Sequence, residues 1–168
     1  YTYKLDRKTW GLHFKGEVLN HTLSNWVYYD SSQVRQATES VNILQVKAQA
    51  NFRIWKMNLD NQVIWQPVLA GQEYVRVPEL LLKHNLYFQS YIFKRSMLAK
   101  VGVLFCYNTA YKADGYAPLT GTFYNQNNFI ASIDPRLDVY ASFRIWQFRF
   151  FARAENLLHF VYERNYAT

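Results

Sequence analysis

Hydrophobic and polar residues alternate along most of this chain with a period of two. The clearest stretch is residues 44–54, where every second residue is apolar and each residue between is Gln, Lys, Asn or Arg. Because side chains of a β-strand point alternately to its two faces, this stretch predicts a strand with one apolar and one polar face. Strands of soluble sheets are commonly about five or six residues long, whereas a tilted membrane strand needs about nine to eleven. The length favours a membrane strand.

The same alternation predicts eight strands in all. Besides 44–54, the clear ones are 10–18, 101–107, 137–145 and 148–154, and the weaker ones are 22–29, 62–68 and 82–93. Short connections are expected near residues 20, 58, 95 and 146, and long ones at 30–40, 69–79, 112–134 and from 157. Short turns at one end of a sheet and long loops at the other are typical of outer-membrane barrels.

Matching apolar faces across a turn is an internal test of the predicted hairpins. The predicted turns and the pairs that they set are 146–147 with Ile145 opposite Phe148, 94–97 with Ile92 opposite Ala99, and 20–21 with Val18 opposite Leu23. In each hairpin the apolar residues fall on one side. The fold class that follows is all-β, an antiparallel transmembrane β-barrel.

Composition agrees with this fold and excludes others. Aromatic residues make up 18% of the chain, and the mean hydropathy is −0.27. No stretch approaches the roughly 18 consecutive apolar residues of a transmembrane helix. Tryptophans near the predicted strand ends suit an aromatic girdle at the membrane interface. The girdle residues that we expect are Trp10, Trp55, Trp65 and Trp146.

The chain is expected to be one segment, 1–168, of a larger barrel. Its predicted strands begin and end on the long-loop side, whereas bacterial barrels normally begin and end on the opposite side. A sheet edge left unpaired in lipid exposes backbone groups that cannot be satisfied. At least one further strand on each side is therefore expected.

The second half resembles a known family. The motifs are Tyr107–Tyr111, Tyr116-Ala-Pro118, Gly121-Thr-Phe-Tyr-Asn-Gln126, Ile133-Asp-Pro135 and Phe148–Leu158. Together they resemble the late barrel region of the putative porins of Bacteroidota. The resemblance implies a Gram-negative outer-membrane barrel for passive passage of small solutes, and the motif loop comprises Tyr111, Tyr116, Pro118, Phe123, Tyr124 and Gln126. The stretch 154–157, Ala-Glu-Asn-Leu, is also similar to late strands of TonB-dependent transporters, and a structural barrel subunit of a larger outer-membrane complex is a further alternative.

Charge adds a candidate selectivity. The formal net charge is +7, and the basic residues recur singly between apolar ones rather than in runs. By strand parity the lumen would carry eight cations and three carboxylates, a surplus that favours anions unless the charges pair with one another. The proposed lumen-lining residues are Lys15, Lys47, Arg53, Lys100, Tyr140, Arg144, Arg149, Arg153 and Glu155. Asp138 and Glu155 are expected opposite each other near Arg153, as a shared ion cluster.

No catalytic chemistry is predicted. The chain has no Gly-rich phosphate loop, no nucleophile elbow and no histidines at ligand spacing. Its single cysteine, Cys106, excludes a disulfide framework and a cysteine-based metal site. We expect a non-enzyme without cofactor or metal, in contact with the lipid bilayer, lipopolysaccharide, small solutes and other outer-membrane proteins, but not with nucleic acid.

Overall fold

A computed structural model describes residues 2–6, 10–30, 32–131 and 134–159, with side chains from residue 11 onward. The fold is all-β and antiparallel. Its strands are β1 (Thr2–Asp6), β2 (Trp10–Leu23), β3 (Val27–Tyr29), β4 (Val34–Gln36), β5 (Val41–Ile54), β6 (Met57–Trp65), β7 (Val68–Ala70), β8 (Leu80–Ile92), β9 (Met97–Asn108), β10 (Tyr111–Lys112), β11 (Gly115–Ala117), β12 (Thr122–Tyr124), β13 (Ile130–Ala131), β14 (Arg136–Ile145) and β15 (Phe148–Ala154).

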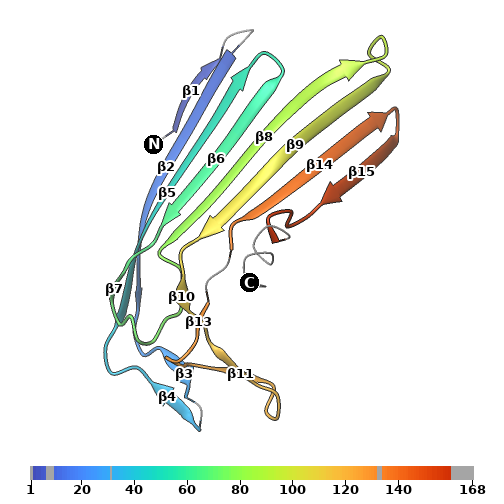
Figure 1. The fold of residues 1–168 in the computed structure, drawn as a ribbon. Helices are drawn as coiled ribbons and strands as arrows, with labels where there is room; N and C mark the ends of the chain where they lie inside the picture. The colour runs from blue at the N-terminus through green and yellow to red at the C-terminus, as the bar shows by residue number, and fades with distance from the viewer. Residues whose placement is uncertain (1, 7–9, 31, 132–133, 160–168) are drawn as a thin grey trace, which may run out of the picture.

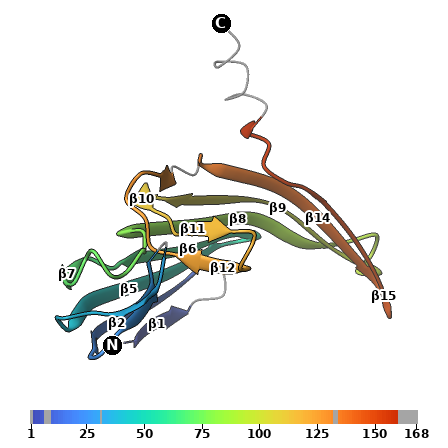
Figure 2. The same ribbon diagram turned by 90° about the horizontal axis from the view of Figure 1, so that it is seen from below.

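One large sheet dominates the molecule. Its strands follow the order β1-β2-β5-β6-β8-β9-β14-β15, each antiparallel to its neighbours, and β7 adds to the end of β5. The sheet is long, twisted and curved, with β1 at one edge and β15 at the other (Figures 1 and 2). Every step along it joins strands that follow each other in sequence, apart from the short strands in the loops. Such local pairing follows from tight hairpins.

The two ends of the sheet differ in their connections. Residues 55–56, 93–96 and 146–147 form tight turns at one end, whereas the segments 24–40, 66–79 and 109–135 connect strands at the other. These longer segments carry the small hairpins β3–β4, β10–β13 and β11–β12, which gather at the lower end in Figure 1. We call these the short-turn end and the long-loop end. The three predicted long connections are present, as are short turns close to three of the four predicted positions, those near residues 58, 95 and 146.

The predicted turn at 20–21 and the strand 22–29 are wrong. Asn20 and His21 continue β2, where they pair with Leu44 and Ile43 of β5. Asn20 is not followed by the glycine that a two-residue hairpin turn favours, and β5 offers partners as far as Val41. The main sheet still has eight strands in its path, because β1, which the alternation missed, takes the place of the strand that is absent.

The other two hairpins test the predicted registers. At 146–147 the register is confirmed, since Ile145 pairs with Phe148 and Arg144 with Arg149. At the β8–β9 turn, Ile92 pairs with Met97 rather than with Ala99. The turn begins one residue earlier than predicted, because residues 93, 94 and 95 all take left-handed φ angles of 49°, 52° and 72°. A shift of two residues keeps each side chain on the same face of the sheet. The predicted residue pairs of this hairpin are therefore wrong, whereas the predicted faces are confirmed.

The sheet separates apolar from charged residues across its whole width. We call the side that carries Val46, Leu86, Val101 and Phe143 the apolar face, and the side that carries Lys47, Tyr87, Lys100 and Arg144 the polar face. Every described Asp, Glu, Lys and Arg within the strands of the main sheet from β2 to β15 falls on the polar face by register.

The sheet has almost no core of its own. Among the described side chains, the buried hydrophobic ones are Ala37, Val41 and Ala99, whereas large apolar residues such as Val101 and Phe150 remain exposed. Apolar surface on this scale is unfavourable in water, at about 25 cal/mol per Å², and it marks a contact with another apolar phase or molecule.

Candidate functional site

The polar face carries all nine predicted lumen residues. Register places Lys15 beside Gln49, Lys47 beside Glu17 and Arg53 beside Asn58. The remaining six lie on the other half of the sheet, on β9, β14 and β15 or directly after β15: Lys100, Tyr140, Arg144, Arg149, Arg153 and Glu155. Lys15 also forms an ion pair with Glu17 within β2.

The structure adds two charged residues to this face that the alternation missed. Asp60 pairs in register with Asn51 and Asn85, and Arg136 pairs with Cys106. Asp60 fell in a predicted turn, while Arg136 stands just one residue before a predicted strand, so that extending the period of two would have found it. Among described side chains on this face, nine cations face four carboxylates, which leaves the expected surplus of five positive charges.

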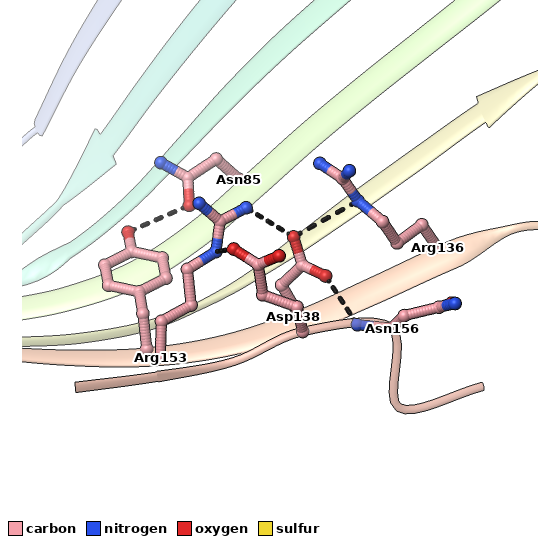
Figure 3. Close-up of polar contacts among 7 residues, drawn as sticks. Asn85, Arg136, Asp138, Arg153 and Asn156 are labelled. Carbon is pink, nitrogen blue, oxygen red and sulfur yellow. Dashed lines mark hydrogen bonds and ion pairs between the residues drawn. The ribbon is translucent and has the colours of Figure 1, made fainter. Parts of the chain in front are cut away.

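Asp138 is the centre of an ion cluster at the long-loop end of β14. Its carboxylate is fully buried and lies 2.5 Å from Nη2 of Arg153 and 3.3 Å from Nε of Arg136. Arg153 also reaches Glu155 with its Nε, at 3.2 Å (Figure 3). The expected cluster of Asp138, Arg153 and Glu155 is thus present, and Arg136 joins it. Within this cluster the two guanidinium groups are balanced by two carboxylates.

The chain after β15 closes over this cluster. The backbone N–H of Asn156 donates to Oδ1 of Asp138 at 2.8 Å, and the N–H of Leu157 donates to the carbonyl of Leu137 at 2.8 Å. Asn156 adopts a left-handed φ of 56°, a conformation that asparagine tolerates better than most residues. The Glu-Asn-Leu stretch therefore has a structural role here, in holding the end of β15 against β14.

An aromatic frame holds Lys100 on the polar face, toward the short-turn end. Its Nζ lies 3.8 Å from the ring centroid of Tyr87 and 5.6 Å from that of Tyr140. The Tyr140 hydroxyl donates to Oδ1 of Asn85 at 2.9 Å, which fixes the ring (Figure 3). Gly102 leaves room for both side chains, because a Cβ there would lie 2.7 Å from the ring and hydroxyl of Tyr140 and 2.7 Å from the Cβ of Tyr87. Lys100 is thus placed by aromatic faces, which attract cations.

The short-turn end of the same face is cationic. A cavity of about 430 Å³ lies there, lined by Gln89, Leu98, Lys100, Tyr140, Ser142, Arg144, Arg149 and Phe151. Three of these residues are cations and none is a carboxylate. Within the part of the chain that the structure describes, none of the three cations forms an ion pair.

At the long-loop end, Asn125 ties three loops together. Its backbone N–H donates to the carbonyl of Tyr29 at 2.7 Å, its side-chain amide donates to the carbonyl of Glu73 at 2.6 Å, and its Oδ1 accepts from Nε of Arg76 at 2.7 Å. Arg76 also donates to Oδ1 of Asn127, at 2.9 Å. A cavity of about 810 Å³ lies beside these contacts, lined by acidic and basic side chains that include Glu39, Glu73, Glu79, Arg76 and Lys112.

Comparison with known families agrees with this architecture. A family model described as "Putative porin" matches residues 1–168, the whole chain. The chain belongs to the Putative porin family. Searches of curated proteins and of solved structures found no match. Membership supports a porin-like role at a coarse level, and it extends the resemblance of the second half to the first.

In this porin-family chain the motif loop serves mainly to shape the long-loop end. Tyr111 lies on β10, Tyr116 and Phe123 pair across β11–β12 with ring centroids 5.1 Å apart, and the ring of Tyr124 packs against Gly115. Pro118 lies in the turn between β11 and β12.

Gln126 organises the end of this loop. Its Oε1 accepts from the backbone N–H groups of Asn128 and Phe129, each at 2.7 Å, and its Nε2 donates to the carbonyls of Phe129 and Ala113. All four polar contacts are to backbone, so that this side chain is an internal bracket of the loop.

The four predicted girdle tryptophans divide between the two ends. Trp55 and Trp146 lie in short turns with left-handed φ angles of 55° and 53°, and Trp146 is 92% exposed. Trp65 ends β6 at the long-loop end, where its Nε1 donates to Glu79 at 3.1 Å. Trp10 begins β2, and its side chain lies outside the described residues.

The described residues offer no group of three or more His, Cys, Asp or Glu side chains placed to hold a metal ion. In the same part of the chain, no helix has the length and apolar character needed to cross a membrane.

Proposed function

We propose that this chain forms part of the wall of an outer-membrane β-barrel through which small solutes pass passively, with a preference for anions and without catalysis. The apolar face lies against lipid in this proposal, the polar face lines the solute path, and the short turns point to the periplasm. Family membership supports the porin-like role.

The observation that carries the proposal is the division of residues between the two faces. Every described charge in the strands from β2 to β15 lies on one face, while the other carries many exposed apolar side chains, such as Val101, Val103 and Phe150. A Lys or Arg on the lipid side of a membrane strand costs about 2–4 kcal/mol at the bilayer midplane. This division of residues suits a sheet that lies between lipid and water, whereas a protein surrounded by water would have to cover the apolar face.

The anion preference rests on the surplus of five cations on the polar face. In a narrow path with low-dielectric walls, such a surplus concentrates anions and repels cations. Arg136 and Arg153 are paired with Asp138. Among the described residues, the surplus therefore lies with the unpaired cations elsewhere on the face, which include Lys100, Arg144 and Arg149 near the short-turn end.

Planar-bilayer recording of the full-length protein tests the passage of solutes. We expect steps of conductance in potassium chloride. Under a gradient of this salt, we expect a reversal potential with the sign of the chloride equilibrium potential. Absence of conductance from folded, inserted protein would contradict the porin role, and a cation-selective reversal potential would contradict the anion preference.

Two neighbouring substitutions on β5, one as the test and one as its matched control, show whether the apolar face lies against lipid. Ala50 lies on the apolar face and Asn51 on the polar face, one residue away. We expect Ala50→Arg to reduce folding into lipid vesicles and Asn51→Arg to fold normally. Equal folding of both variants would show that the apolar face does not meet lipid.

A second candidate is a structural subunit of a larger outer-membrane complex. Exposed apolar residues at the tip and base of the longest loop favour it: Leu119, Phe123, Phe129 and Ile130. Purification with a stoichiometric partner, lost on Leu119→Ser and Phe123→Ser substitution, would support this role.

A further inference from the structure

Two arginines face each other at the short-turn end of the polar face. Arg144 of β14 pairs in register with Arg149 of β15, and both side chains are exposed. Residues directly opposite in an antiparallel pair have Cβ atoms about 4.5–5.5 Å apart, and like charges in such positions destabilise the pairing. The register therefore places two arginine side chains next to each other, and an anion bound between their guanidinium groups would remove the repulsion between the like charges.

A third cation belongs to the same place. Lys100 lies opposite Ser142, and Ser142 lies opposite Phe151, so that these residues form the row beside the arginine pair. The aromatic frame of Tyr87 and Tyr140 holds the ammonium group without neutralising it. No carboxylate lines the cavity of about 430 Å³ that Lys100, Arg144 and Arg149 share.

The lining also defines the chemistry of the ligand. Guanidinium groups bind planar or tetrahedral oxyanions through paired N–H donors, which a spherical halide cannot use in the same way. Ser142 and Gln89 add neutral donors, while Leu98 and Phe151 form apolar walls. This set suits a phosphate or carboxylate group carried on a small organic solute.

We propose that Lys100, Arg144 and Arg149 form an oxyanion-binding subsite at the short-turn end of the polar face. It binds the phosphate or carboxylate group of a passing solute and is saturable, unlike the diffuse anion preference of the whole face. That the ligand is a passing solute rests on the proposed function, but binding by these residues does not.

Calorimetric titration of the full-length protein in neutral detergent with inorganic phosphate, in a chloride background, tests the subsite directly. The test variant is Arg144→Gln/Arg149→Gln, and the control Lys47→Gln/Lys83→Gln removes the same charge from the same face outside the cavity. Loss of charge-assisted hydrogen bonds should weaken phosphate binding roughly 10- to 100-fold in the test variant, and less than about threefold in the control, where only screened long-range attraction is lost.

Equal weakening in both variants, or no saturable phosphate binding by the unmodified protein, would overturn the proposal. A melting curve with and without phosphate supplies a second measurement on folded protein. We expect phosphate to raise the melting temperature of the unmodified protein and of the control, but not that of Arg149→Gln. A rise in all three would overturn the proposal.

Two further experiments distinguish a lipid headgroup from a solute as the source of the anion, and distinguish failure of the subsite from failure of the porin role. Titration with a short-chain phosphatidic acid tests a lipid headgroup, and binding of that lipid without binding of inorganic phosphate would overturn the solute subsite. Bilayer recording is independent: phosphate binding without conductance would contradict the porin role alone, whereas conductance that phosphate reduces equally in both variants would contradict the subsite alone.

Discussion

The two ends of the β14–β15 hairpin carry the same kind of residue in opposite electrostatic states. At the long-loop end, Arg136 and Arg153 share the buried carboxylate of Asp138. At the short-turn end, Arg144 and Arg149 face each other, and no carboxylate lines the cavity that they share. The strands and the face are the same, and the guanidinium groups differ only in the neighbours that the register gives them.

The difference shows which charges hold the sheet and which remain available to a solute. A buried carboxylate with two guanidinium partners and a backbone N–H is satisfied, and such a group contributes to stability only while all its partners remain. Exposed cations without partners contribute nothing to packing and oppose each other. The hairpin therefore combines a structural end with a binding end.

The largest effect is expected at the structural end. Asp138→Ala leaves Arg136 without its carboxylate, leaves Arg153 with Glu155 alone, and removes the acceptor of the Asn156 N–H. The two arginines are partly exposed, so that water compensates them in part, and the loss of their charge-assisted hydrogen bonds should lower the free energy of unfolding by about 2–3 kcal/mol. Urea unfolding from lipid vesicles, followed by tryptophan fluorescence, measures it.

Glu155→Ala is the control, because Glu155 is exposed and touches the same Arg153 from outside. Exposed pairs contribute only about 0–1 kcal/mol, so that this variant should unfold almost as the unmodified protein does. If both substitutions lower the free energy of unfolding equally, the burial of Asp138 does not make its ion pairs more important to stability than the exposed pair of Glu155.

A middle-sized effect is expected between the two ends, at Gly102. A methyl group there would overlap the ring of Tyr140 and the Cβ of Tyr87, and overpacking of this kind costs about 1–3 kcal/mol. Gly102→Ala should displace Tyr140 from Asn85 and release Lys100 from its frame. Thermal unfolding measures the loss.

The compensating variant Gly102→Ala/Tyr140→Ala checks the cause. The smaller side chain at 140 makes room for the added methyl group, so that the second substitution should cost less in the Gly102→Ala background than alone. Additive losses would mean that the ring and the methyl group do not meet.

The alternation of residues predicts the faces better than the connections. Phe148–Ala154 and the 146–147 turn agree with the structure because both faces of the hairpin are unambiguous. The turn at 20–21 fails because Asn20 and Thr22 are polar residues on the otherwise apolar face of β2, and only the partner strand β5 shows that the strand continues. Pairing is a tertiary property that one strand's sequence does not contain.

The candidate site divides in the same way. Parity alone places Arg144 opposite Arg149 and Asp138 near Arg153. It cannot show that Asp138 is fully buried while the arginine pair is exposed. That distinction comes from the chain after β15, where the left-handed Asn156 turns its backbone N–H onto the carboxylate. The alternation of apolar and polar residues within a strand does not predict the path of the chain after the strand ends.

The smallest effect, and one of opposite sign, is expected at the binding end. Arg149→Glu places a carboxylate opposite Arg144 and so gives the short-turn end the kind of pairing that the long-loop end already has. Relief of repulsion and gain of an exposed cross-strand ion pair should raise the free energy of unfolding by about 0.5 kcal/mol at low salt, and the gain should shrink as salt screens it. Urea titrations at two salt concentrations measure this, with Arg149→Gln as the control that relieves repulsion without adding a pair.

Arg149→Glu should also abolish the response of the melting temperature to phosphate. A variant that is more stable yet still binds phosphate would show that the arginine pair is not the site, and a variant that is less stable would show that the two guanidinium groups do not oppose each other as their register indicates.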